Sequence, residues 1–401
     1  MERFNHSIKE TIDEFAEHRD AATMDALIAQ FREPNLPDEC IAHLARRLGE
    51  SGEVLSHSLS DRTADVPSTG GPSSLSTLLC PLQLVAAGAR VPKLGVPGRP
   101  AGGIDVLACI PGFKPTLEVS EVLSCLHGCG YAHFLAGRRF APLDALLFSY
   151  RQKVGAQDVA ALAIASLLSK KIAVGVKQVT LDIRVAPFTN FGDWDTARAN
   201  GLRFISVAKH LGMSATCLLT DCRVPYQGHI GRGESLVALK SFFDGRATSE
   251  LLSHVSLCRR MAEDCLGQAI ETSAVDLGAI FRSHLEQQGT TWERFEQKTD
   301  EVLSRPKVTM QAKTDGYLAI DLDGLRRTLT AYQRNKATED VPFPDPCGIA
   351  LTVSCDSAVR RGDVIAEVRA MENLELIVAE LSKHIHQAEH PSLRREPEPI
   401  T

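Results

Sequence analysis

The feature that most constrains the fold is a strand–helix–strand pattern in the middle of the chain. Val179–Val185 and Ser214–Asp221 are strand-like segments, and Asp195–Leu211 between them has the pattern of one long helix. A strand, a helix and a second strand at this spacing form a βαβ unit with parallel strands. The middle of the chain is therefore predicted to be α/β.

The segments that flank this unit have different patterns of apolar residues. From Ser7 to Leu55, apolar residues recur at three- and four-residue steps, which is typical of packed amphipathic helices. Beyond about Lys307 strand-like alternation returns, as in Gly316–Asp321 and Ile349–Val353. The predicted fold class is α/β with a separate all-α domain and a small C-terminal α+β unit.

A chain of 401 residues is too long for one ordinary core, so several structural units are expected. They are a first helical part (1–60), an α/β part with a glycine-rich loop (61–140), a second helical part (141–175), the continued α/β part (176–305), the C-terminal α+β unit (306–390) and a tail (391–401). Prolines and mixed charges lead us to expect that the tail is disordered.

Composition excludes several functions. The net charge of -6 gives no general affinity for nucleic acid or for an anionic membrane. No apolar run is long enough to span a bilayer, and Met1–His6 is no signal peptide, so we expect a cytoplasmic protein. The eleven cysteines are scattered, and Cys125 and Cys129 with His127 lack a second ligand pair. Reduced thiols and no metal are therefore predicted.

One loop looks suited to an anion. Ser68-Thr69-Gly70-Gly71 offers two hydroxyl donors and two glycines that let backbone N–H groups point inward. No Lys, Arg or His lies between Asp65 and Ser74, however, where a phosphate site would be expected to carry one. The loop is therefore either a phosphate cradle without its cation or a turn that never held phosphate.

Three stretches together resemble the pyrimidine nucleoside phosphorylase family, which includes thymidine phosphorylase. They are "SYRQKVGAQDVAALAIASLLSKKIAVG" (149–175), "FREPNLPDECIAHLARRLGESGEVL" (31–55) and "ATCLLTDCRVPYQGHIGRGESL" (215–236). The resemblance runs from about Met24 to Gly245, with a weaker echo at Asp315–Ala370. It implies a nucleoside phosphorylase/phosphoribosyltransferase-like architecture, in which substrates bind in a cleft between a helical and an α/β domain.

The same resemblance implies an enzyme, a pentosyltransferase, which cleaves or forms the N-glycosidic bond of a pyrimidine (deoxy)nucleoside. Its partners would be a pyrimidine nucleoside or base and phosphate, with no other cofactor, and the helical domain would build a homodimer. It further implies that Arg151, Ser166 and Lys170 hold the base, with Arg151 and Lys170 as catalytic residues. Ser166 and Lys170 are four apart and hence on one face of a helix. Such donors would stabilise charge on the departing base.

For the anion, the resemblance implies roles for Ser68, Thr69, Gly70, Gly71 and Thr77. The family's first loop reads Asp-Lys-His-Ser-Thr-Gly-Gly, but here Val66 and Pro67 stand where it has lysine and histidine. In the second loop, Arg99-Pro100-Ala101-Gly102-Gly103 lies where the family has a threonine for phosphate, and Arg99 is the candidate replacement cation. Ala186–Phe191 replaces a third, glycine-rich loop.

Two other features carry charge near the predicted cleft. Asp182 and Arg184 end a predicted strand, where α/β proteins place ligand groups, but pairing with each other is favoured. His229 or Arg232 could approach the cleft, although a hydrogen-bonded loop histidine is favoured. Two alternatives to phosphorolysis remain open. One is a relative that uses water or a non-phosphate acceptor, with Arg62 or Arg99 for a nucleotide's own phosphate, and the other is a non-catalytic pyrimidine-binding protein.

Overall fold

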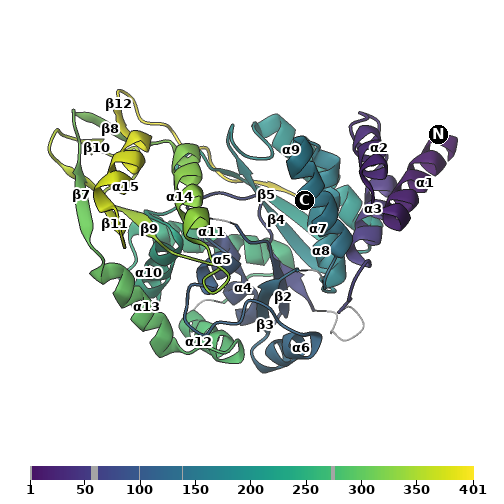
Figure 1. Cartoon of the computed structure of the whole chain (residues 1–401), viewed down its shortest axis with the longest axis horizontal. Coiled ribbons are helices and arrows are strands. Elements are labelled where there is room, and N and C mark those ends of the chain that lie inside the picture. Colours follow the sequence, from purple (N-terminus) through teal and green to yellow (C-terminus); the bar gives the residue numbers. More distant parts are fainter. Residues whose placement is uncertain (1, 56–61, 99, 138, 272–275) are drawn as a thin grey trace.

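The computed structural model describes residues 2–55, 62–98, 100–137, 139–271 and 276–401 (Figure 1). Its central sheet contains β1 (Ala64–Asp65), β4 (Gln178–Val185) and β5 (Ser214–Asp221), all parallel and in that order. Helix α9 (Trp194–His210) connects β4 to β5. The predicted βαβ unit is confirmed.

Beyond β1 the chain adds a second parallel pair, β2 (Val91–Gly95) with β3 (Tyr131–Leu135). A parallel bridge between Thr63 and Arg90 joins this pair to the segment that leads into β1. The carboxyl ends of β1, β2, β3 and β4 therefore open in the same direction. In open α/β sheets this edge is where ligands bind.

The helical part is assembled from two separated stretches of the chain. They contribute α1 (Glu2–His18), α2 (Ala21–Phe31), α3 (Asp38–Gly49), α7 (Pro142–Val154) and α8 (Ala160–Ala173). Helix α3 begins at Asp38, directly after Pro37, with two acidic residues in its first turn. These acids complement the positive end of the helix dipole. In Figure 1 this part lies at the right, beside α9.

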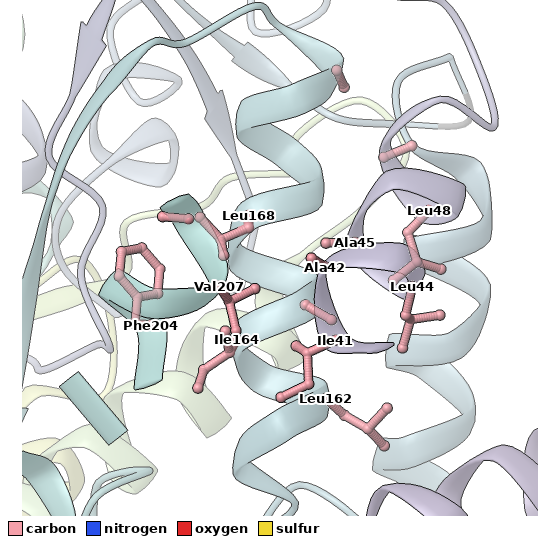
Figure 2. Packing of buried hydrophobic residues seen from close by; sticks show 14 of the residues in the cluster. Ile41, Ala42, Leu44, Ala45, Leu48, Leu162, Ile164, Leu168, Phe204 and Val207 are labelled. Carbon is pink, nitrogen blue, oxygen red and sulfur yellow. The ribbon is translucent and has the colours of Figure 1, made fainter. Parts of the chain in front are cut away.

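One continuous core joins these helices to the sheet. Ile41 and Leu48 of α3, Leu168 of α8 and Phe204 of α9 lie in the same buried cluster (Figure 2). The odd-numbered residues of β4, from Val179 to Val185, belong to this cluster too. Because side chains alternate along a strand, the other face of the sheet has its own core.

That second core is covered by a different set of helices. They are α4 (Ser76–Ala86), α5 (Ile104–Leu107), α10 (Arg232–Phe243), α11 (Ser249–Leu266), α12 (Leu277–Gln287) and α13 (Trp292–Ser304). Helix α6 (Val119–Gly128) precedes β3. Helix α4 begins at Ser76, a short segment after the Ser68–Gly71 loop, so its start lies near the same edge of the sheet.

The C-terminal part forms the predicted α+β unit, at the left of Figure 1. Its sheets have the orders β6-β9-β11-β7 and β10-β8-β12. The strands are β6 (His229–Ile230), β7 (Lys307–Gln311), β8 (Gly316–Ile320), β9 (Cys347–Leu351), β10 (Ala358–Val359), β11 (Val364–Ala370) and β12 (Ile385–Ala388), with α14 (Leu322–Lys336) and α15 (Leu374–Leu381). Strand β6, from the α/β part, joins this unit by pairing with β9.

The expectation of a disordered tail at 391–401 is wrong. Residues Glu398–Ile400 form β13, which pairs antiparallel with the edge strand β5. Ile400 is buried in the core of the helical part, and Glu398 accepts two hydrogen bonds from Arg198 at 2.7 and 2.9 Å. One apolar side chain and one ion pair thus order a segment whose composition favours disorder.

Two further findings concern the whole chain. All eleven cysteines are free thiols, and most of them are buried. Within the described ranges, no helix is both long and apolar enough to cross a membrane.

Candidate active site

A cavity of about 180 Å³ opens where α7 and α8 face the carboxyl ends of the sheet strands. The predicted site residues that line it are Ser68, Thr69, Gly70, Gly71, Thr77, Arg151, Ser166 and Lys170. The structure therefore brings together two sets, one from the first glycine loop and one from the helices. Arg99 and the role expected for it lie outside the described residues.

Lys170 is held in place by two neighbours on the helices. Its Nζ donates to Asp144 Oδ2 at 2.5 Å and to Ser166 at 2.7 Å (backbone O) and 3.0 Å (Oγ). Ser166 and Lys170 thus share one face of α8. Asp144, buried in the first turn of α7, was not predicted. The ammonium is neutralised by one carboxylate and orients the Ser166 hydroxyl at the cavity wall.

Arg151, near the end of α7, is only 2% exposed. Its Nε donates to Ala156 O at 3.1 Å, and Nη2 donates to Gln157 O and Val159 O, both at 3.4 Å. These carbonyls belong to the turn between α7 and α8, so the guanidinium fixes that turn. Burial lowers the pKa of Arg151, with carboxylates nearby opposing the shift. No described carboxylate hydrogen-bonds to Arg151, which lines the cavity.

The first glycine loop is pinned to the end of β4. Thr69 N donates to Asp182 O at 3.0 Å, and Thr69 Oγ1 accepts from Arg184 N at 2.9 Å. Gly71 has φ +146°, and a Cβ there would lie 3.0 Å from Cys222 Sγ and 3.1 Å from Arg184 Nη1. Both its conformation and its surroundings therefore require glycine.

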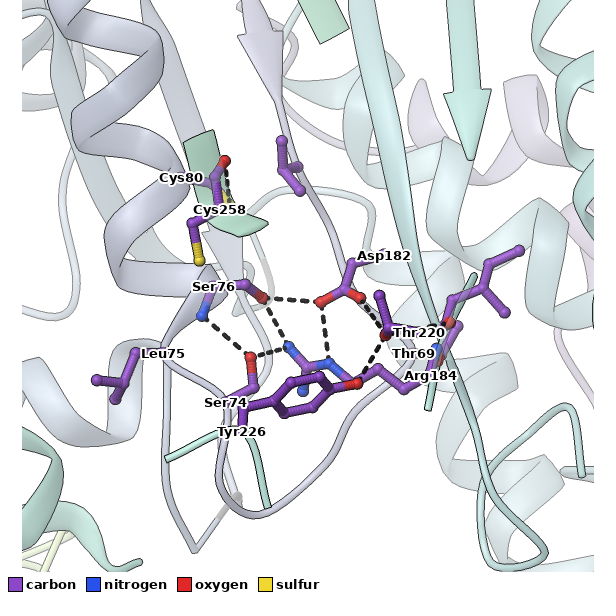
Figure 3. A network of polar contacts seen from close by, with 12 residues as sticks. Thr69, Ser74, Leu75, Ser76, Cys80, Asp182, Arg184, Thr220, Tyr226 and Cys258 are labelled. Carbon is purple, nitrogen blue, oxygen red and sulfur yellow. Dashed lines mark hydrogen bonds and ion pairs between the residues drawn. The ribbon is translucent and has the colours of Figure 1, made fainter. Parts of the chain in front are cut away.

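Beneath this loop lies a buried polar network (Figure 3). Arg184 Nε donates to Asp182 Oδ2 at 2.9 Å, which confirms the expected pairing. Arg184 Nη2 also donates to Ser74 Oγ at 2.8 Å and Ser76 Oγ at 2.7 Å. On the far side, Thr220 Oγ1 donates to Asp182 Oδ1 at 3.2 Å. The network fixes the start of α4 relative to β4, and with it the loop between them.

The positions expected to carry a lysine and a histidine are apolar and buried. Val66 belongs to the core beneath the sheet, and Pro67 lines the cavity through a side chain that cannot donate a hydrogen bond. The backbone oxygen of Val66 accepts a hydrogen bond from Lys93 Nζ at 3.0 Å.

Lys93 belongs to a cluster that was not predicted from the sequence. Its Nζ donates to Asp65 Oδ1 at 2.5 Å, and Lys171 pairs with the second oxygen, Oδ2, of the same carboxylate. All three side chains are at least nine-tenths buried, and all line the cavity. Burial alone would raise the pKa of Asp65, but the two ammonium groups outweigh it and hold that pKa well below its usual range.

His133 on β3 also lines the cavity and was not predicted. It is 1% exposed, and its Nδ1 shares a hydrogen bond of 2.9 Å with the Tyr131 hydroxyl. Burial, followed by the nearby Lys93, lowers the pKa of His133 well below its usual value. The imidazole is therefore neutral at physiological pH.

Two candidates do not reach this cavity. His229 Nδ1 shares a hydrogen bond of 2.9 Å with Glu234 Oε2, and Arg232 pairs with Asp105 at 2.8 Å. Both lie where the C-terminal unit meets α10 and are absent from the residues that line the cavity. Throughout the described ranges, no group of three or more metal-ligating side chains is found.

Comparisons with known proteins find relatives by sequence and by fold. No protein-family model matches the chain. A thymidine phosphorylase from Sinorhizobium fredii is 26% identical over 355 residues, which cover 84% of this chain and 80% of that protein. An AMP phosphorylase from Methanococcus maripaludis is 24% identical over 385 residues, or 93% of this chain and 75% of that protein.

Among solved structures, anthranilate phosphoribosyltransferase from Thermus thermophilus is similar with a TM-score of 0.50. It is 15% identical, and the match covers 75% of this chain and 94% of that one. This likeness shows a nucleoside phosphorylase/phosphoribosyltransferase-like fold, and together with the similarity to thymidine phosphorylases it supports a pentosyltransferase. By sequence, the chain is similar to thymidine phosphorylases at 26–29% identity, as the resemblance predicted.

Proposed function

We propose that this protein is a glycosyltransferase that breaks or forms the N-glycosidic bond of a pyrimidine (deoxy)nucleoside. One observation carries the proposal: Arg151, Ser166 and Lys170 line the same cavity as the Ser68–Gly71 loop. A base held by the three helical residues would have its sugar directed toward the loop, where the acceptor binds.

The chemistry follows from where charge develops. As the glycosidic bond breaks, the pyrimidine gains negative charge and the sugar gains positive charge. Arg151 and Lys170 are the cations that would stabilise the departing base, and the Ser166 hydroxyl would donate to one of its carbonyl oxygens. Because Asp144 and the turn carbonyls already orient these groups, little reorganisation is needed when charge appears.

Phosphate is the acceptor that the relatives' names suggest, and we propose it for this chain. Water or another acceptor is the second candidate, and the observation that favours it is the apolar pair Val66–Pro67. We also propose a homodimer built through the helical part, to be checked by light scattering on the purified protein.

The test is a product analysis. The protein is incubated with uridine, thymidine and AMP, each with and without phosphate, and products are separated by chromatography. AMP is included because one relative is an AMP phosphorylase. Free pyrimidine with pentose 1-phosphate, formed only with phosphate, identifies a phosphorylase. Free pyrimidine without phosphate identifies a hydrolase. No product from uridine or thymidine would contradict the proposed activity, even if adenine is released from AMP.

A further inference from the structure

Lys93 and His133 are buried polar side chains to which the proposed base site assigns no role. They are direct register partners on the parallel strands β2 and β3, and both line the cavity. Paired residues of neighbouring strands project to the same face of a sheet. A lysine and a histidine therefore lie side by side on the acceptor side of the cavity. They are near the first loop, in which Val66 and Pro67 occupy the positions expected to carry a lysine and a histidine.

The charges around Lys93 do not balance. Asp65 contributes one negative charge, whereas Lys93 and Lys171 contribute two positive charges, which leaves a net charge of one positive unit. Elsewhere on the cavity wall, Lys170 is balanced by Asp144 and Arg184 by Asp182, whereas Arg151, on the helical side, hydrogen-bonds to backbone carbonyls. An unbalanced buried charge is costly unless a counter-charge is supplied, and an anionic ligand supplies one.

Lys93 also has donor capacity left. An ammonium group carries three protons, and Asp65 and Val66 O accept two of those of Lys93. Among the described residues, no further hydrogen bond of this Nζ is found. The third proton is therefore available to a ligand.

His133 offers a second donor beside it. Its Nδ1 is occupied by Tyr131, and the opposite edge of the ring lies against two glycines of the second loop. A Cβ at Gly95 would lie 3.3 Å from Nε2, and one at Gly103 would lie 4.0 Å from Cε1. If the Tyr131 hydroxyl donates to Nδ1, Nε2 carries the ring proton and can donate it.

We propose that Lys93 and His133 form a phosphate-binding subsite of this cavity, taking the role that the lysine and histidine of the first loop would have had. The subsite rests on the proposed function, because it places an oxyanion opposite the base. The phosphate group is either free phosphate or the phosphate of a bound nucleotide. Lys93 supplies the positive charge, and neutral His133 donates a hydrogen bond. The glycines, which have no side chain, let the phosphate group come close to the backbone.

The experiment uses calorimetric titration of the full chain. Wild type, Lys93→Met and Lys93→Gln are titrated with inorganic phosphate in the presence of uracil, with which phosphate cannot react, with uridine 5′-monophosphate, and with uracil alone. Lys93→Met leaves Asp65 paired one-to-one with Lys171, so the buried charge becomes neutral and folding is expected. Lys93→Gln keeps a donor for Val66 O without the charge, should the apolar variant fail to fold. Lys240→Met removes an ion-paired lysine on α10, outside the cavity-lining residues, and is the matched control.

We expect both Lys93 variants to weaken phosphate binding about tenfold to hundredfold, while affinity for uracil changes less than about twofold. Lys240→Met should bind both as wild type does. An effect on free phosphate identifies a separate acceptor, and an effect confined to uridine 5′-monophosphate identifies the substrate's own phosphate. Replacing His133 by Phe should give a smaller loss of the same kind.

Two results would overturn the subsite. Either wild type binds no phosphate in either form, or the Lys93 variants bind it as tightly as wild type does. The uracil arm separates these failures from failure of the proposed function. If uracil binds and phosphate does not, the base site is supported and the subsite is not. If phosphate binds in a Lys93-dependent way and uracil does not bind, only the subsite is supported.

Discussion

Lys170 and Asp144 show how one buried pair connects stability to recognition. Their side chains are 12% and 5% exposed, and the carboxylate lies 2.5 Å from the ammonium. Replacing Lys170 by Met leaves a buried charge without its partner. We expect the free energy of unfolding to fall by about 3–5 kcal/mol, measured by urea denaturation.

The double variant Lys170→Met/Asp144→Asn is the control for that prediction. It removes both charges, so most of the lost stability should return. If the double variant is as unstable as the single one, the pair is not the source of the loss.

Gly71 tests the geometry of the first loop. Replacing it by Ala forces a side chain into φ +146° and against Cys222 and Arg184. We expect a loss of about 1–3 kcal/mol in unfolding free energy. Gly212 has φ +73°, and a Cβ at that position would meet nothing within 4 Å, so Gly212→Ala should lose only the backbone contribution, about 1 kcal/mol. Equal losses would show that the contacts at Gly71 do not matter.

At the scale of elements, the sequence predicts the helices and strands that have a pattern within their own residues. Strand β4 alternates apolar with polar residues, β5 contains a short apolar run and α9 is a long periodic helix, so the predicted bounds of each lie close to the observed ones. Strand β13 was missed because Ile400 is its one buried apolar residue. Its partner, Cys217 on β5, is far away in the sequence, and such pairing leaves no local pattern.

The contribution of β13 to stability can be tested at Ile400. Ile400 is 7% exposed and contacts the core between α9 and β5, so Ile400→Ala should lower the unfolding free energy by about 2–4 kcal/mol. Leu393, 81% exposed in the same tail, is the matched control, and Leu393→Ala should stay within about 0.5 kcal/mol. Thermal denaturation of both variants decides whether β13 contributes to the fold.

The residues of the candidate site likewise divide into those that a local stretch of sequence predicts and those that it does not. Arg151, Ser166 and Lys170 were predicted because a resemblance spans one contiguous helical stretch. Lys93 and His133 lie on separate strands, and only the β2–β3 register shows that they are neighbours. One signal was present: a lysine within the otherwise apolar run "VPKLG" must find a partner if the strand is buried.

For the whole molecule, buried histidines determine how stability depends on pH. Burial lowers the pKa of His254 and of His284 to about 3. His254 Nε2 accepts a hydrogen bond from Leu75 N at 2.9 Å, which requires the neutral ring. Between about pH 6.5 and 3 the unfolded chain therefore binds protons that the folded chain does not, and stability falls as the pH is lowered.

We expect the free energy of unfolding to fall by about 2 kcal/mol for each of these histidines when the pH is lowered from 7 to 5. His284 stacks on Tyr131 at 3.9 Å between ring centroids, so His284→Phe keeps the packing and removes the titration. Urea denaturation at both pH values should show a smaller pH effect in that variant. The exposed His127 is the control, and His127→Gln should leave the pH effect unchanged.

The central claim is that the cavity between α7, α8 and the sheet recognises a pyrimidine through Arg151, Ser166 and Lys170. Calorimetric titration of uracil and thymine into wild type and into the Lys170→Met/Asp144→Asn variant tests it most directly. The account predicts that wild type binds a pyrimidine and that the double variant, although folded, binds it at least about tenfold more weakly. Absence of binding to wild type, or equal affinity for the two proteins, would contradict it.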